Sequence, residues 1–146
     1  MEAMTDLDVV VAFEHAIIHA GDPHAAMRYA SPDFTVREAP STPYRTPIVG
    51  YEGLLQLRED VTRLCEFEGA AQTEYYLARP GLVVGRVKRQ ARLRSTGEPF
   101  NFLVTEWITV EDGLVRDVEV FYFENAPLAQ CARALDDRDR PLLSPE

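Results

Sequence analysis

The chain of 146 residues has only two cysteines and a single lysine. So few cysteines argue against a disulfide-rich protein and against a cysteine-based metal site. Cys65 and Cys131 are too few for a disulfide framework, and their separation does not match a metal-binding motif. We therefore predict two free thiols in a protein of the reducing cytoplasm. The lysine is Lys88, and the other 14 basic residues are arginines. Genomic base composition can produce that bias, so it carries no functional weight.

Long apolar runs are also missing from the sequence. Because no stretch of roughly 18 apolar residues is present, we predict no membrane span. Residues 1–6 lack the basic region that begins a secretory signal, so we expect none. The chain carries 24 acidic and 15 basic side chains, and its net charge of −9 argues against a nucleic-acid partner.

The apolar content, 46% of 146 residues, is enough for one domain with a buried core. Apolar residues at helical spacing predict a first helix over residues 6–20 and a short second helix over 22–30. A strand over 34–38 follows. Residues 39–49 hold three prolines and are therefore neither helix nor central strand. A third helix is predicted over residues 51–67.

The second half of the chain predicts a sheet. Alternation of apolar and polar residues indicates four strands, over residues 72–78, 82–94, 100–111 and 114–123. Asp112-Gly113 is a strong hairpin signal between the last two strands. We place a domain over residues 1–126 and a tail over 127–146, which has a short helix at 128–135 and a mobile end. The predicted class is α+β, with helices on one face of a curved, mainly antiparallel sheet that encloses a pocket.

Three glutamates lie on apolar faces of these predicted elements. Glu14 falls on the apolar side of the first helix at about 100° per residue. Glu38 shares a strand face with Phe34 and Val36, and Glu106 is the one charged residue on its strand face. Because burying an unpaired carboxylate is costly, each has a structural alternative to a pocket role. Glu14 can pair with an arginine, Glu38 can reach solvent past the sheet edge, and Glu106 can form a buried salt bridge.

Arg89 points inward from a strand whose outer face is basic. The even positions between Arg86 and Arg94 are all polar, whereas the odd positions beside Arg89 are the apolar residues Val87, Ala91 and Leu93. An inward arginine can hold a buried carboxylate such as that of Glu106. It can also bind an anionic or carbonyl group of a ligand.

Other chemistries leave weak signals. His15, His19 and His24 lack metal-ligand spacing, and no nucleophile elbow, HExxH motif or phosphate loop is present. We expect neither a metal nor a cofactor. Glutamates that face an apolar pocket are therefore the strongest chemical signal in the sequence.

Four stretches together resemble the nuclear transport factor 2-like (NTF2-like) superfamily, in particular its SnoaL-like polyketide cyclase and ketosteroid isomerase branches. They are VVVAFEHAIIHAGDP, SPDFTVREAP, TPIVGYEGL and LVTEWITVEDGLVRDVEVFYFE, and the resemblance runs from about residue 6 to residue 125. It implies a conical, cystatin-like α+β barrel in which the curved sheet and three helices surround a deep apolar cavity.

The resemblance also implies roles for the glutamates. Glu38 occupies the position of the aspartate general base in ketosteroid isomerases, and Glu106 that of their protonated aspartic acid. Glu14 falls at or beside the first-helix position where those enzymes use a tyrosine. Because the sequence lacks that tyrosine, it departs from the isomerases toward the cyclase and epoxide-opening branches. In polyether epoxide hydrolases a second carboxylate comes from near the end of the third helix, where Glu66 or Glu68 lies.

We therefore expect a cofactor-independent acid–base enzyme of secondary metabolism that cyclises or isomerises a polyketide-like, hydrophobic small molecule. The predicted catalytic residues are Glu38, Glu106 and Glu14. The predicted substrate contacts are Tyr44, Arg89, Phe102, Val118 and Tyr122.

Two alternatives stay open. One is an epoxide hydrolase, or an epoxide-opening cyclase, that uses the same carboxylates. The other is a non-catalytic, dimeric ligand-binding module whose glutamates pair with Arg89 and its neighbours. We expect a homodimer, because Leu103, Trp107 and Phe121 would otherwise leave an apolar patch exposed on the outer face of the sheet.

Overall fold

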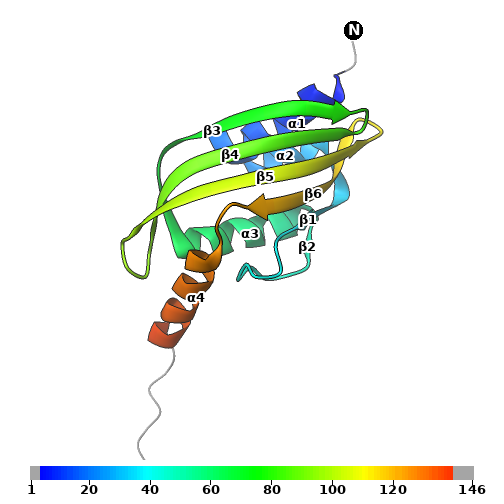
Figure 1. Cartoon of the computed structure of the whole chain (residues 1–146). Coiled ribbons are helices and arrows are strands. Elements are labelled where there is room, and N and C mark those ends of the chain that lie inside the picture. The colour runs from blue at the N-terminus through cyan, green and yellow to red at the C-terminus, as the bar shows by residue number, and fades with distance from the viewer. Residues whose placement is uncertain (1–3, 140–146) are drawn as a thin grey trace, which may run out of the picture.

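The computed structural model describes residues 4–139, in which a curved sheet packs against helices (Figure 1). The helices are α1 (Asp6–Glu14), α2 (Pro23–Ala26), α3 (Gly50–Leu64) and α4 (Ala126–Asp139). The strands are β1 (Ala30–Arg37), β2 (Ile48–Val49), β3 (Cys65–Arg79), β4 (Leu82–Leu93), β5 (Pro99–Glu111) and β6 (Leu114–Tyr122). The order in the sheet is β2-β1-β6-β5-β4-β3, and β1 runs parallel to β6 while the other neighbours are antiparallel. The predicted α+β class and its mainly antiparallel sheet are confirmed.

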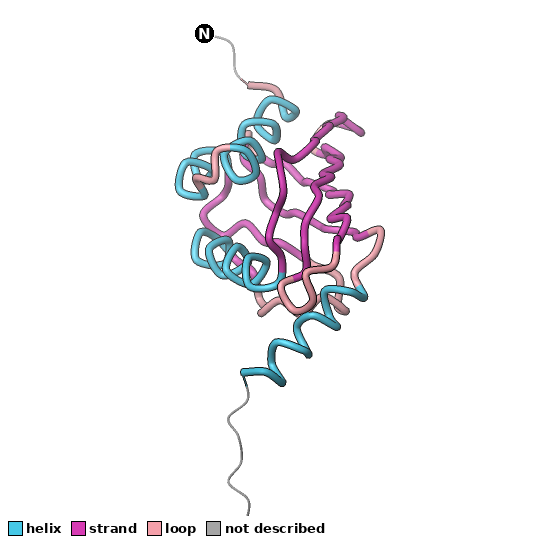
Figure 2. The backbone as a smooth tube through the Cα atoms, turned by 90° about the vertical axis from the view of Figure 1, so that its left-hand side faces the viewer, coloured by secondary structure: helices cyan, strands magenta, loops and turns pink. Residues whose placement is uncertain are grey.

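Helices α1, α2 and α3 cover one face of the sheet, and Figure 2 shows helices on one side of the strands. Apolar side chains of α1 and of the strands meet between the two layers. Val10, Phe34 and Ile108 are at most 1% exposed there. The rings of Phe13 and Phe34 pack edge to face, with centroids 5.6 Å apart. Burial of this area supplies the main driving force that holds the helices on the sheet.

Local sequence signals set the ends of the first two helices. Thr5 and Asp8 form a reciprocal capping box, in which the Thr5 hydroxyl accepts from the Asp8 N–H at 3.1 Å. The helix continues past Glu14 as a wider π-helical turn, His15–His19. Asp22 then caps α2 by accepting from the N–H of Ala25. The predicted helices over residues 6–20 and 22–30 are thus present, although the second is α-helical only over Pro23–Ala26.

The predicted hairpin at Asp112-Gly113 joins the last two strands and sets their first residue pairs. Both residues have positive φ, 51° and 74°, as a tight two-residue turn between antiparallel strands requires. Glu111 therefore stands opposite Leu114 at the start of the ladder. A register shift between Thr109 and Val110 then moves the pairing by one residue, so that Glu106 stands opposite Val120 and shares its sheet face.

The prediction of a third helix over residues 51–67 is wrong at its C-terminal end. The helix stops at Leu64, and β3 begins at once with Cys65 opposite Leu93. Glu66 and Glu68 consequently lie on the outer face of the sheet, where they pair with Arg94 and Arg92. The continuous apolar pattern misled the prediction, because no glycine or proline marks the change from helix to strand.

Helix α4 extends the short helix that the sequence predicts at residues 128–135. Its buried residues, Leu128, Cys131 and Ala132, pack into the core next to the end of α3. Residues 136–139, predicted as part of a mobile end, form its last turn. There Arg63 binds the carboxylates of Asp136 and Asp139 at 3.0 Å each. The remainder of the predicted mobile end, residues 140–146, lies outside the described residues.

The two cysteines are free thiols, as predicted, and both are buried. The Cys131 thiol donates to the carbonyl oxygen of Leu64 at 3.5 Å. Burial is the main cause that raises the pKa of the Cys65 thiol, to about 12. Because the thiolate is the reactive form, Cys65 is a structural residue rather than a nucleophile.

The outer face of the sheet exposes large apolar side chains. Trp107 is 43% exposed and Phe121 is 51% exposed. The homodimer expected from this face stays a prediction. Across residues 4–139, every helix falls short of the length and apolar content that a membrane-spanning helix requires.

Candidate functional site

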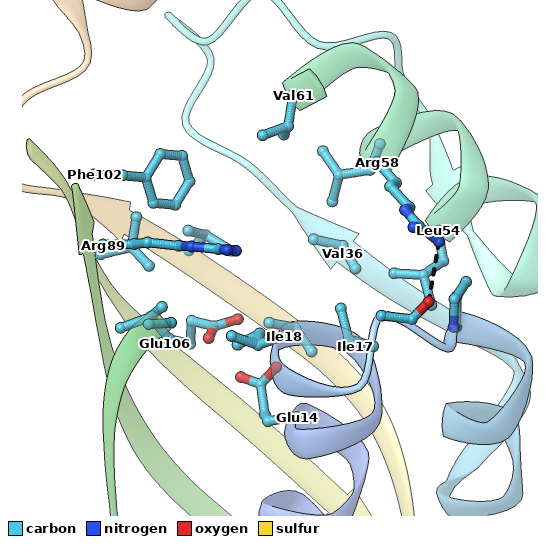
Figure 3. A pocket seen from close by; sticks show the side chains of 18 of the residues that line it. Glu14, Ile17, Ile18, Val36, Leu54, Arg58, Val61, Arg89, Phe102 and Glu106 are labelled. Carbon is cyan, nitrogen blue, oxygen red and sulfur yellow. Dashed lines mark hydrogen bonds between the residues drawn. The ribbon is translucent and has the colours of Figure 1, made fainter. Parts of the chain in front are cut away.

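A cavity of about 490 Å³ opens between the helices and the inner face of the sheet (Figure 3). Most of its wall is apolar and comes from α1, α3 and strands β1 and β3–β6. Seven of the eight residues predicted for the site line it. They are Glu14, Glu38, Arg89, Phe102, Glu106, Val118 and Tyr122. Tyr44 does not line the cavity, and its place is described below.

Strand pairing places Glu38 and Glu106 on the same face of the sheet. Val36 of β1 stands opposite Val118 of β6, and Glu106 of β5 stands opposite Val120 of β6. Val118 and Val120 share a face because they are two residues apart. Glu38 follows Val36 at the same spacing, just beyond the end of β1. Both carboxyl groups therefore point toward the cavity, as the alternation of apolar residues predicted.

Glu14 reaches the cavity from the opposite layer. It is the last residue of α1, and only 3% of it is exposed. The π-helical turn His15–His19 begins directly after it, and such turns frequently occur at functional sites. In Figure 3 the carboxyl of Glu14 points toward that of Glu106. Among the described residues, no hydrogen-bond donor apart from that neighbouring carboxyl is near Oε1 of Glu14.

Glu14 and Glu106 form a carboxyl pair. Burial raises the pKa of both groups, and the charge of Glu106 raises the pKa of Glu14 further. A hydrogen bond between the two carboxyls favours the proton on Glu14 and the charge on Glu106. The two acids are coupled, because ionisation of one opposes ionisation of the other. Both carboxyls line the cavity.

The pKa of Glu38 lies near neutral pH. Burial, together with the charge of Glu106, raises the pKa of Glu38 to about 7. The Tyr122 hydroxyl beside Glu38 favours the charged form and limits the rise. The hydroxyls of Tyr122 and Tyr44 are 3.0 Å apart, so Tyr44 lies behind Tyr122 and holds it in place. Glu38 is therefore divided between acid and base forms near pH 7.

Tyr75 lies next to the carboxyl pair but is not among the residues that line the cavity, and the sequence did not reveal it. Its hydroxyl is buried without a hydrogen-bond partner among residues 4–139, beside Glu14 and Glu106, whose charges raise its pKa further. The ring lies over Gly85, where an added Cβ would come within 2.7 Å of it. Gly85 also stands opposite Glu106. The sequence signal that could have indicated Tyr75 is Gly85 on the inner face of β4. Because glycine has no side chain, a neighbouring aromatic ring can approach the backbone there.

Arg89 lines the cavity but forms no ion pair with Glu106. The register explains this, because Arg89 stands opposite Phe102 while Glu106 stands opposite Gly85, four residues away along β4. The salt-bridge alternative for Glu106 therefore finds no support in the described part of the chain. Arg58 of α3, also missed from the sequence, is a second arginine in the wall.

Together these side chains supply the components of acid–base chemistry. The pKa of Glu38 is about 7, burial raises the pKa of both members of the carboxyl pair, and the wall around them is mostly apolar. In the described ranges, no three His, Cys, Asp or Glu side chains are grouped to hold a metal ion.

The fold matches solved structures over nearly its whole length. An NTF2-like protein from Burkholderia xenovorans LB400 aligns with a TM-score of 0.72 and 19% identity, over 90% of this chain and 98% of that one. The chain has the NTF2-like fold. A protein of Mesorhizobium loti named as a SnoaL-like polyketide cyclase has 21% identity and a TM-score of 0.64, over 82% of this chain and 100% of that one.

A polyketide cyclase of Pseudomonas putida KT2440, so named, has the NTF2-like fold as well. It aligns with 15% identity and a TM-score of 0.65, over 88% of this chain and 98% of that one. No family model and no curated protein matches the chain. At these identities the matches establish the fold, and the chemistry has to be argued from the cavity.

Glu38 should make the free energy of unfolding fall as the pH rises. Its pKa increases from 4.5 in a model peptide to about 7 in the fold, so between these values the folded state binds more protons than the unfolded state. Wild type should therefore lose stability across that window, and Glu38→Gln should lose about 2 kcal/mol less than wild type. Urea unfolding at pH 5 and pH 8 measures the difference. The exposed Glu98→Gln should follow wild type, and a Glu38→Gln protein that did so would contradict this prediction.

Proposed function

We propose that the protein is an acid–base enzyme that removes a proton from carbon next to a carbonyl group and closes or isomerises a polyketide-like substrate. Glu38 is the general base. The Glu14–Glu106 pair donates a proton, or a hydrogen bond, to the carbonyl oxygen. Phe102 and Val118 hold the apolar body of the substrate between them.

One observation carries this proposal: Glu38, with a pKa of about 7, shares an apolar cavity with a carboxyl pair whose pKa values are raised by burial. A base works best when its pKa lies near the pH at which it acts. An acid that stays protonated at that pH complements it, and separate environments push the two titrations apart. A base and an acid with different pKa values in one cavity indicate acid–base catalysis more specifically than three buried glutamates alone would.

The ring-closing reaction balances without a further reactant. The Glu38 carboxylate takes the proton from the α-carbon, and the electron pair left behind forms the new bond to a second carbonyl carbon. The oxygen of that carbonyl takes the proton from the Glu14–Glu106 pair. The product is an isomer of the substrate, and the enzyme resets when solvent returns a proton to the pair and accepts one from Glu38. Proton transfers of this kind contribute about 10²–10⁴ in rate.

The fold neighbours support this reaction class over its rivals. Two of them are named polyketide cyclases, and one from Rhodopseudomonas palustris is named an isomerase. The epoxide-opening alternative loses the second carboxylate expected from the third helix, because Glu66 and Glu68 lie on the outer face of the sheet. A binding module would have no need of a base with a pKa of about 7 beside a protonated pair.

Exchange of carbon-bound hydrogen tests the proposal without knowledge of the natural substrate. In D₂O the protein should speed the loss of the α-proton signals of 2-tetralone, a neutral apolar ketone, at least tenfold over buffer. The rate should rise with pH to a plateau with its midpoint near pH 7, where Glu38 ionises. Proton NMR follows the exchange. A rate equal to that of buffer across pH 5–9 would count against the proposed base.

A further inference from the structure

The cavity contains two arginines that bind no carboxylate of residues 4–139. Arg89 comes from the inner face of β4, and Arg58 comes from α3 on the other side of the cavity (Figure 3). Arginines elsewhere in the described chain commonly form ion pairs, and those that do are Arg37, Arg45, Arg63, Arg86, Arg92, Arg94 and Arg116. The net charge is −9, so carboxylates are plentiful. The absence of an ion pair at these two cavity arginines in this part of the chain therefore points to a role other than pairing with the protein's own carboxylates.

Arg89 is held in place by contacts that leave its two terminal nitrogens free within the described residues. Its Nε donates to the carbonyl oxygen of Gly69 at 3.0 Å. Its guanidinium carbon lies 4.7 Å from the centre of the Phe67 ring, which supports the plane of the group. The hydrogen bonds in residues 4–139 include none from Nη1 or Nη2 of Arg89. The side chain is half-buried and lines the cavity, and Figure 3 shows it extending into that space.

Glu106 does not serve as the missing partner. A cation bound to Glu106 would lower its pKa, whereas the pKa of Glu106 is raised, with burial as the main cause and no contribution from Arg89. Arg58 is exposed and donates to the carbonyl oxygen of Gly21 at 3.3 Å, which places it at the rim. Arg89 is therefore the cation best placed to meet a ligand inside the cavity.

We propose that the substrate carries a carboxylate and that Arg89 binds it through Nη1 and Nη2. The inference rests on the function proposed above, because it concerns the same cavity. A planar guanidinium matches the two oxygens of a carboxylate, and such two-point contacts fix orientation as well as affinity. A singly charged group also suits a site that holds three glutamates, since a doubly charged one would be repelled more strongly. Arg89 thus sets which end of the substrate approaches the acid pair.

A matched pair of probes tests this inference by binding alone. Naphthalene-2-carboxylate and its methyl ester have the same aromatic body, but only the first is an anion. Wild type should bind the carboxylate at least tenfold more tightly than the ester, as measured by calorimetry at pH 8. Arg89→Gln should weaken carboxylate binding by about tenfold to a hundredfold and change ester binding less than about twofold.

Two further variants separate charge from folding. Arg89→Lys keeps the cation without the planar fork, so it should retain part of the preference for the carboxylate. Lys88→Gln removes a positive charge from the exposed face of the same strand and should match wild type. Melting temperatures check that each variant folds. Equal affinity of wild type for the two probes, including no measurable binding of either, would overturn the inference, and so would an equal loss of both in Arg89→Gln.

The result can be separated from a failure of the proposed chemistry. Hydrogen exchange into 2-tetralone uses a neutral ketone and does not depend on a carboxylate site. Exchange with a midpoint near pH 7, combined with equal binding of the two naphthalene probes, would retain the proposed base and reject Arg89 as an anion site. The reverse result would retain the anion site and reject the base.

Discussion

Replacing Glu38 with Gln should lower the rate of hydrogen exchange into 2-tetralone by about 100-fold or more at pH 8, while the protein stays folded. Gln keeps the size of Glu and most of its hydrogen bonds, but it cannot accept a proton at this pH. The same change removes a buried charge, because Glu38 is ionised above its pKa of about 7. The variant should therefore be at least as stable as wild type at pH 8. Exchange rates and melting curves measured on the same samples provide both values.

The combination of these two effects identifies Glu38 as a functional group. A glutamate that only anchored the structure would leave its partners unsatisfied when replaced, and stability would fall before activity did. Glu119→Gln is the matched control, since Glu119 lies on neighbouring β6 and pairs with the exposed Arg37. It should keep wild-type exchange. Full exchange by a folded Glu38→Gln protein would remove this residue from the mechanism.

The face on which each candidate residue lies could be predicted from sequence because side chains alternate along a strand. Phe34, Val36 and Glu38 had to share a face, and so did Phe102 and Glu106. That periodicity holds whatever the neighbouring strand is. It was therefore enough to place Glu38 and Glu106 toward one cavity, provided that a single sheet held both strands.

Which residues stand next to one another could not be predicted in the same way. Arg89 and Glu106 share a face, yet the register sets them four residues apart along β4, so the salt bridge considered as the alternative for Glu106 does not form among the described residues. Register depends on turn geometry and on the packing of whole strands, which the alternation of one strand does not contain. Tyr75 was missed for the same reason, because its place depends on standing opposite Gly85.

The change from helix to strand at Leu64 shows a second limit. Residues 61–67 have apolar side chains at spacings that suit either structure, and no glycine or proline interrupts them. The decision is made by tertiary pairing of Cys65 with Leu93 and by burial of Phe67 against Phe102, whose ring centroids are 5.5 Å apart. These contacts turn Glu66 and Glu68 away from the cavity and remove them as candidate catalytic groups.

A double-mutant cycle at Glu14 and Glu106 should show that the two acids act as one unit. Each single replacement by Gln should lower the exchange rate by about 100-fold, because either one breaks up the carboxyl pair that presents the acidic proton. The double variant should lose little more than a single one, since that proton can be lost only once. Independent groups would instead multiply to about 10⁴-fold.

The pH profile distinguishes shared proton transfer from a shared structural role. In wild type the rate should fall again at high pH, where the Glu14–Glu106 pair loses its last proton. That fall should be absent from the residual activity of the double variant, because Gln does not titrate. Each single variant keeps one carboxyl that still titrates. The rise near pH 7 should remain, since Glu38 is intact in all three variants. A multiplicative loss would mean that Glu14 and Glu106 work separately. A high-pH fall preserved in the double variant would mean that the proton needed at the carbonyl oxygen comes from another group.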